Sequence, residues 1–123
     1  MPPFRVQGEK IKGTNVHLLR CHGELDAHTF EVLDEEFQSI FDEGIRQVIV
    51  DLSDVPYMSS AGIGVLVGAS TEVEEEGGGV IVLSPSATVL SVFRDMGFDN
   101  MFTIVKTMEE ACAALGVTPP GDA

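Results

Sequence analysis

The sequence predicts an α/β domain in which a mixed sheet of about five strands carries about four helices, mainly on one face. Short apolar segments rich in β-branched residues alternate with longer segments whose apolar residues recur at helical spacing. The apolar run 48–52 is typical of a central parallel strand that is buried on both faces. A chain of 123 residues fits one domain. The segments in their order along the chain predict the elements β-β-α-β-α-β-α-β-α.

The first third of the chain predicts a hairpin followed by a helix. Segments 4–11 and 15–21 flank a Gly-Thr-Asn turn, which is typical of two antiparallel strands. Asp26 stands at the position of an N-cap, and the helix is expected over residues 27–42. Gly44 ends it. Its core face consists of apolar residues at helical spacing, namely Phe30, Leu33, Phe37, Ile40 and Phe41.

The strand 48–52 is followed by a turn over residues 53–59 and a helix over residues 60–76. The expected inward stripe of this helix is Ile63, Leu66, Val67, Ser70 and Val73. Val65 and Ala69, together with Gly68, fall outside that stripe and are expected on the exposed face. Small apolar residues there have two interpretations, a docking surface or ordinary surface residues.

The segment after this helix predicts a short buried strand over residues 80–83. Ser84 and Pro85 then have the types expected of an N-cap and of the first helical residue. The helix that they open is expected to end at Gly97, and a last short strand is expected over residues 102–105.

Thr107 and Glu110 have the spacing of a capping box, which predicts a final helix through Leu115. The segment after it is short and contains Pro and Gly. We therefore expect a domain over residues 1–116 and a flexible C-terminal tail over residues 117–123.

The charge balance limits the classes of partner. The chain has 20 acidic and 7 basic residues, which gives a formal net charge of −13. Such a surface repels phosphate backbones and anionic lipids, so direct binding to nucleic acid or to a membrane surface is not expected. A basic partner surface would complement the charge, and solubility alone explains it equally well.

Cysteine and histidine positions give no sign of a metal site or of a cofactor. Cys21 and Cys112 lack metal-ligand spacing and are predicted to be free buried thiols. His17, His22 and His28 have no helical pairing that would favour metal binding, so they are interpreted as solvated or structural. No signal segment or membrane span is evident, and a cytoplasmic protein is expected.

The chemically informative position is a serine at the start of the helix 60–76. Unpaired backbone N–H groups and the positive end of the helix dipole meet there, so a phosphate on Ser60 would be stabilised without refolding. Gly62 and Gly64 follow without side chains, which would let another protein approach the backbone closely. From the residues alone, however, Ser59 and Ser60 are better explained as helix caps.

Two motifs resemble the STAS family, specifically the bacterial anti-sigma factor antagonists. The first is DLSDVPYMSSAGIGVLVG over residues 51–68, and the second is GELD over residues 23–26. The resemblance extends over about residues 4–115 and implies a single STAS-like domain. It also implies that Ser60 is phosphorylated by a partner serine kinase with an ATP-binding domain, which is itself the anti-sigma factor. The family usually has Asp before the acceptor, where this chain has Ser59, so Ser59 is the second candidate acceptor.

The same resemblance implies a partner switch without catalysis by this chain. The unmodified protein would bind the anti-sigma factor and release the sigma factor; phosphorylation would end that binding, and a separate serine phosphatase would reset it. Asp26 would help orient the kinase reaction and add negative charge at the contact surface. Asp51 and Asp54 would contribute to the same negatively charged surface. The expected partner-binding residues are Asp26, Met58, Ser59, Ser60, Gly62, Gly64 and Val65.

Other functions are weighed against this switch. The pattern Gly62-x-Gly64 is not a dinucleotide motif, because its glycines lie far beyond the end of the strand. A hydrolase elbow needs a glycine two residues before the serine, and neither serine has one. The remaining alternative is a STAS accessory or scaffold subunit of a lipid-transport ATPase or of a stress-sensing assembly, without a phospho-switch.

Overall fold

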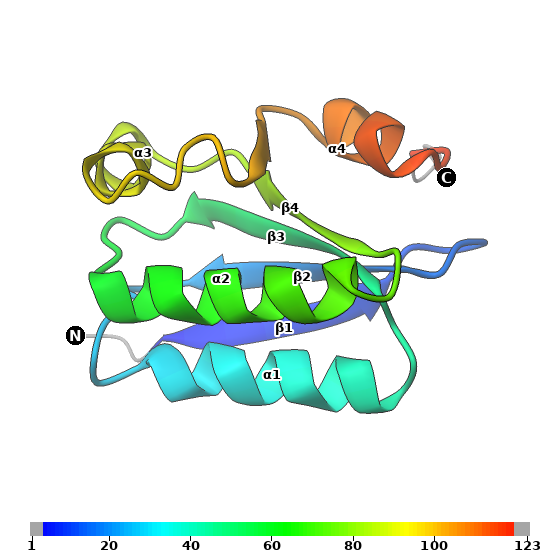
Figure 1. The fold of residues 1–123 in the computed structure, drawn as a ribbon, viewed down its shortest axis with the longest axis horizontal. Helices are drawn as coiled ribbons and strands as arrows, with labels where there is room; N and C mark the ends of the chain where they lie inside the picture. Colours follow the sequence, from blue (N-terminus) through cyan, green and yellow to red (C-terminus); the bar gives the residue numbers. More distant parts are fainter. Residues whose placement is uncertain (1–3, 120–123) are drawn as a thin grey trace.

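A computed structural model describes residues 4–119 of the chain and shows a five-stranded sheet with four helices (Figure 1). The predicted fold class and order of elements are confirmed. The elements are β1 (Arg5–Lys10), β2 (Val16–His22), α1 (Phe30–Asp42), β3 (Gln47–Asp54), α2 (Ser60–Glu74), β4 (Gly79–Leu83), α3 (Ala87–Asp95), β5 (Thr103–Val105) and α4 (Met108–Leu115).

The strands lie in the sheet in the order of the sequence, β1-β2-β3-β4-β5. β1 and β2 form the predicted antiparallel hairpin, and the remaining neighbours pair in parallel. In the middle of the sheet Val50 faces Leu19 on one side and Val82 on the other. Because β2 to β5 are parallel, their carboxyl ends meet at one edge of the sheet.

Each face of the sheet contributes to its own apolar cluster. On one face α1 and α2 lie side by side (Figure 1), and they pack with α3 over residues such as Val48, Val50 and Leu52 of β3. On the other face α4 alone covers Ile49 of β3 and its neighbours. The helices therefore lie mainly on one face, as predicted. Cys21 and Cys112 are free and buried, also as predicted.

α1 begins three residues later than predicted. The carboxylate of Asp26 accepts a hydrogen bond from the backbone N–H of His28 at 2.9 Å, which closes a turn and not a helix. The hydroxyl of Thr29 donates to the carbonyl of Glu24 at 2.8 Å, and Thr29 is the N-cap of a helix that starts at Phe30. Local bonding by short polar side chains thus competes with helix formation over residues 27–29.

The buried face of α2 is wider than the predicted stripe. Val65 and Ala69 are 9% and 5% exposed, so the prediction that they lie on an exposed face is wrong. Val67, predicted to point inward, is only partly buried. The physical reason is that α2 contacts both the sheet and α1, so two of its sides are covered. Only Gly68 of the predicted outer group is exposed.

The C-terminal half corrects one cap and confirms another. Ser86, whose hydroxyl accepts from the N–H of Val89 at 3.1 Å, is the N-cap of α3 in place of Ser84. The capping box of Thr107 and Glu110 is formed as predicted. Val117 packs against the α4 cluster, so packing reaches beyond the predicted boundary at residue 116, and residues 120–123 of the predicted tail lie outside the described part.

Candidate functional site

Two loops come together where β2 and β3 end. The backbone N–H of Gly23 donates to the carbonyl of Asp54 at 3.1 Å, and that of Leu25 donates to Tyr57 at 3.0 Å. The N–H of Ser59 donates back to the carbonyl of Leu25 at 2.9 Å. These bonds continue the parallel pairing of the two strands, and they place the second motif beside the two serines of the first.

The two serines at the start of α2 have different surroundings. Ser59 is the N-cap, and its hydroxyl accepts from the N–H of Ala61 at 3.3 Å. Ser60 is the first residue of the helix, as predicted, and it is exposed. The structure therefore places one serine in a capping role and the other at the surface, at the positive end of the helix dipole.

Asp26 lies next to this helix start because residue 25 pairs with residues 57–59. It is half-buried, and one carboxylate oxygen accepts a hydrogen bond from the His28 N–H. The same oxygen lies 3.2 Å from the Thr29 hydroxyl, whose single proton is shared with the closer carbonyl of Glu24. These local contacts hold the carboxylate at the turn before α1. Asp26 therefore stabilises the turn before α1 and also contributes negative charge beside the two serines.

Three of the predicted partner-binding residues lie inside the domain. Met58 is fully buried and Val65 is 9% exposed. Gly62 is also buried, and a Cβ atom there would lie 2.8 Å from side-chain carbons of Leu25 and Met58. These residues support the site from beneath and present little surface to a partner. Their contact with a partner therefore stays a prediction, and the structure shows them packed on the inner side of α2.

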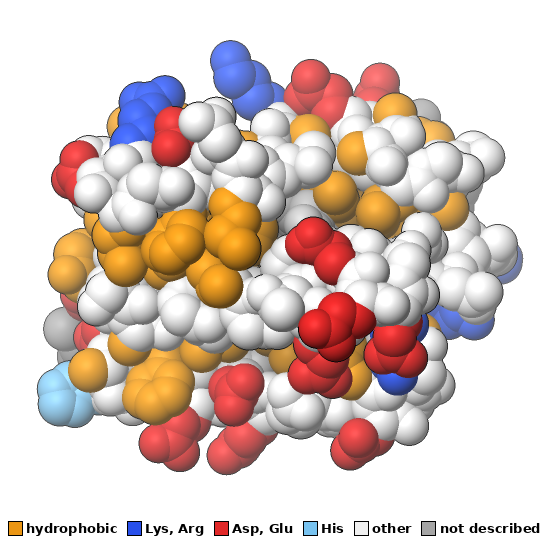
Figure 2. All heavy atoms as spheres, in the orientation of Figure 1, with side chains coloured by type: hydrophobic (Ala, Val, Ile, Leu, Met, Phe, Trp, Pro, Cys, Tyr) orange, Lys and Arg blue, Asp and Glu red, His pale blue; other side chains and the backbone are white. Residues whose placement is uncertain are grey.

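The outer side of α2 begins with Ser60 and continues with Gly64 and Gly68, which are exposed at intervals of one helical turn. A Cβ atom at either glycine would meet nothing within 4 Å. Figure 2 shows hydrophobic side chains gathered between α2 and α3, and acidic ones near the C-terminal end of α2. We call Ser60, Gly64 and Gly68 the outer ridge of α2. It is narrow, uncharged and free of side chains beyond the serine.

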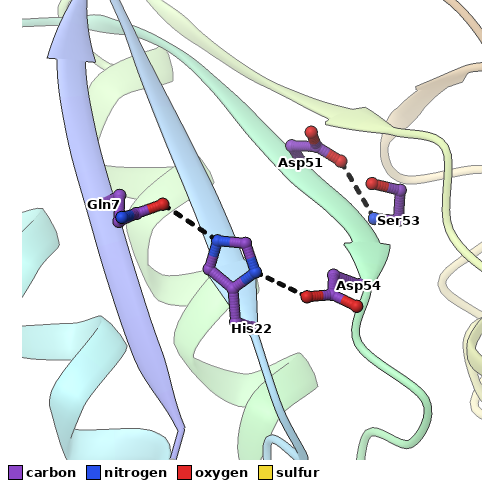
Figure 3. A network of polar contacts seen from close by, with 5 residues as sticks. All are labelled: Gln7, His22, Asp51, Ser53 and Asp54. Atoms are coloured by element: carbon purple, nitrogen blue, oxygen red, sulfur yellow. Dashed lines mark hydrogen bonds and ion pairs between the residues drawn. The ribbon is translucent and has the colours of Figure 1, made fainter.

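A polar network that the sequence interpretation missed lies on the other face of the sheet, at the same edge (Figure 3). His22 Nδ1 is 2.6 Å from the carboxylate of Asp54, and its Nε2 is 3.1 Å from the side-chain oxygen of Gln7. The Asp51 carboxylate accepts from the N–H of Ser53 at 2.9 Å. These contacts fix the end of β3 just before the loop that leads to Ser59. The sequence feature that could have indicated this network is that His22 and Asp54 each lie at the end of a strand.

The remaining reactive groups bear on two kinds of site, a reactive thiol and a metal site. Burial, with the negative charges of Asp51 and Glu36, raises the pKa of the Cys21 thiol to about 12, so it stays protonated and unreactive near neutral pH. Within residues 4–119 no group of three or more His, Cys, Asp or Glu side chains is arranged to hold a metal ion. In the same part of the chain no helix has the length and apolar character required to cross a bilayer.

Comparisons of sequence find a family and relatives that match most of the chain. The model of the STAS domain matches residues 8–111. The anti-sigma F factor antagonist of Lysinibacillus sphaericus is 33% identical over 81 residues, which cover 65% of this chain and 69% of that protein. The anti-sigma-B factor antagonist of Staphylococcus epidermidis is 27% identical over 96 residues, with 78% and 89% covered.

Solved structures extend the comparison to the whole fold. The anti-sigma factor antagonist SpoIIAA in its unphosphorylated form superimposes with a TM-score of 0.77 at 25% identity, covering 92% of this chain and 98% of that chain. The phosphorylated form of SpoIIAA from Bacillus gives a TM-score of 0.69 at 28% identity, covering 89% and 97%.

Proposed function

The chain belongs to the STAS domain family, its similar relatives are anti-sigma factor antagonists, and we propose that it is such an antagonist, switched by phosphorylation of Ser60. In this proposal the unmodified protein binds an anti-sigma factor that carries an ATP-binding serine kinase domain, and the sigma factor is released. The kinase then transfers a phosphoryl group to the Ser60 hydroxyl, and a serine phosphatase removes it.

The observation that supports Ser60 over Ser59 is the division of roles between them. The Ser59 hydroxyl is already engaged with the N–H of Ala61, and its residue is half-buried. Ser60 is exposed at the end of α2, where the helix dipole stabilises an added anion. A kinase can therefore reach Ser60 without breaking the cap.

The electrostatics of α2 explain why a phosphate would act as a switch. The segment SAGIGVLVGAS, which forms the first 11 of the 15 residues of α2, has no ionisable side chain. A phosphate adds nearly two negative charges there at neutral pH. Where a negative group of the partner comes within roughly 4 Å of this phosphate, the repulsion costs about 1–4 kcal/mol at the dielectric constants of water and of a protein surface. Each 1.4 kcal/mol of that cost raises Kd about tenfold.

The outer ridge of α2 supplies the contact surface in this proposal. Ser60, Gly64 and Gly68 follow one another on the exposed side, and apolar side chains gather on the surface between α2 and α3 (Figure 2). A partner helix or loop could approach the backbone of α2 closely along this line. Asp26 would then face the partner beside the acceptor hydroxyl and help orient the kinase reaction.

The experiment compares wild type, Ser60→Asp and Ser59→Asp as immobilised baits in extract from the source cell. Ser59→Asp is the matched control, because Asp is also a favoured N-cap and adds the same charge one residue away. We expect an ATP-binding anti-sigma kinase on wild type and on Ser59→Asp, and at least about tenfold less on Ser60→Asp. Mass spectrometry identifies the partner, and circular dichroism confirms that each bait is folded.

Addition of ATP to the captured kinase then tests the acceptor directly. Wild type and Ser59→Ala should each gain one phosphoryl group by intact mass, whereas Ser60→Ala should gain none. Phosphorylation of Ser60→Ala would assign the acceptor to Ser59 and contradict our choice. Equal retention of one partner by all three baits would remove the switch altogether and favour a permanent subunit of a transport ATPase or of a stress-sensing scaffold.

A further inference from the structure

A crevice at the carboxyl ends of β4 and β5 lies outside the proposed switch. β4 leads into α3, whose Val89 and Phe93 pack on the same face as α1 and α2. β5 leads into α4, whose Ala111 and Cys112 pack on the opposite face. The loops that follow these two strands therefore leave toward opposite faces of the sheet, and residues after β4 and β5 border a crevice together with residues of α3. Here the cavity has a volume of about 570 Å³.

The lining of this crevice has an apolar part and a cationic part. Pro85, Leu90 and Ile104 supply apolar surface. Arg94 and Lys106 supply two of the few cations in a chain with 7 basic residues and a net charge of −13. Neither cation forms an ion pair with a carboxylate of the described residues. A volume of roughly 300–1,000 Å³ with apolar walls and few charged groups is typical of small-molecule sites.

The one carboxylate in the lining limits the charge of a ligand. Asp99 lies in the crevice with Arg94 and Lys106, so these three groups carry one net positive charge. The nearby carboxylate of Glu110 accepts hydrogen bonds from the backbone N–H groups of Lys106 and Thr107 in the cap of α4, and its negative charge further limits the charge of an anion in the crevice. The lining therefore complements an anion of one charge better than a polyanion.

Ser84 gives a second indication that this crevice is a formed site. It lines the crevice and, among residues 4–119, is the only non-glycine residue in the left-handed backbone region, with φ of 54°. Its N–H donates to the carbonyl of Val105 at 2.7 Å, which ties the loop after β4 to the end of β5. A strained residue persists where its surroundings hold it, and such residues concentrate at ligand sites.

We propose that this crevice binds a small organic monoanion with an apolar body, such as a medium-chain aliphatic carboxylate. Arg94 and Lys106 would hold the anionic group, with the planar guanidinium of Arg94 suited to a carboxylate. Leu90, Ile104 and Pro85 would cover the aliphatic part. The site is separate from Ser60, so its occupancy does not depend on the phospho-switch.

The test titrates the isotopically labelled full chain with octanoate and follows backbone amide resonances by NMR. We expect saturable shifts at Ser84, Leu90 and Val105. Octylammonium, which has the same tail and the opposite charge, and acetate, which lacks the tail, should each bind at least about tenfold more weakly.

Variants then assign the binding to the two cations. Arg94→Gln and Lys106→Gln should each raise the Kd for octanoate about tenfold, since each removes a charged hydrogen-bond partner of the anion. Lys12→Gln is the matched control, because Lys12 is also a surface cation but lines other hollows, and its Kd should equal that of wild type.

Four outcomes would overturn the proposal. They are octanoate shifts that do not saturate, equal binding of octylammonium, equal binding of acetate, and an unchanged Kd in both Arg94→Gln and Lys106→Gln. The last measurement is valid only for folded variants, which the dispersion of the same spectra establishes. None of these outcomes depends on whether Ser60 is phosphorylated, so failure here leaves the proposed switch intact.

Discussion

The inner and outer sides of α2 place the same residue type in opposite environments. On the inner side Gly62 is buried, and a Cβ atom would lie 2.8 Å from side chains of Leu25 and Met58. On the outer side Gly64 and Gly68 are exposed, with nothing within 4 Å of a Cβ atom. Packing requires the first glycine, whereas the fold does not require the other two.

This difference indicates which residues serve the fold and which serve the surface. Glycine within a helix costs about 1 kcal/mol relative to alanine. The inner glycine offsets this cost by letting α2 approach Leu25 and Met58 closely. The outer glycines have no such compensation within the described residues. The partner contact proposed above would explain why glycine stands at these positions.

The largest effect is expected from the inner side. Met58 is fully buried beneath the start of α2, and Met58→Ala would leave a cavity between Leu25 and Gly62. We expect the free energy of unfolding to fall by about 2–5 kcal/mol. Urea denaturation followed by circular dichroism measures this change. A loss below that range with reduced partner binding would show that Met58 acts at the surface, as the sequence first indicated.

A smaller loss is expected from Gly62→Ala. The added methyl group must displace side-chain carbons of Leu25 and Met58, at an overpacking cost of about 1–3 kcal/mol. The better helix propensity of alanine offsets about 1 kcal/mol of this cost. The net loss, measured in the same denaturation series, should therefore be about 0–2 kcal/mol. A stabilised Gly62→Ala protein would remove the contrast between the two sides.

The sequence predicted the architecture because periodicity reports which faces are buried. The run 48–52 indicated a central strand, and β3 has that place. The spacing of Thr107 and Glu110 predicted a capping box that is formed. Periodicity could not give the width of a buried face. Val65 and Ala69 are covered because α1 lies beside α2, and one helix alone carries no information about its neighbour.

The site was only partly predictable for a related reason. The motif placed Ser60 at the start of a helix, and the structure agrees. Whether the neighbouring residues face outward depends on the fold of residues 23–26 against residues 57–59, which is a long-range pairing. The contacts of His22 with Asp54 and Gln7 likewise depend on strand register across the sheet. Spacing within one segment does not determine either.

The outer side gives the smallest change in stability and the clearest test of the comparison. Gly64→Ala and Gly68→Ala add a methyl group that meets nothing in the domain, and both positions have room in the helix. Each substitution should raise the free energy of unfolding by about 0.5–1 kcal/mol, because alanine favours the helix and glycine disfavours it.

The same substitutions should weaken binding of the anti-sigma kinase, since each methyl group projects from the outer ridge beside Ser60. Calorimetric titration of the purified protein with the purified kinase measures the change in Kd. Thr71→Ala, which lies farther along the exposed side of α2, controls for substitution elsewhere on this helix. Stability and binding would then move in opposite directions at Gly64, whereas at Gly62 any loss of binding would follow the loss of stability. If Gly64→Ala and Gly68→Ala gain stability and keep full affinity, the outer ridge is not the contact surface.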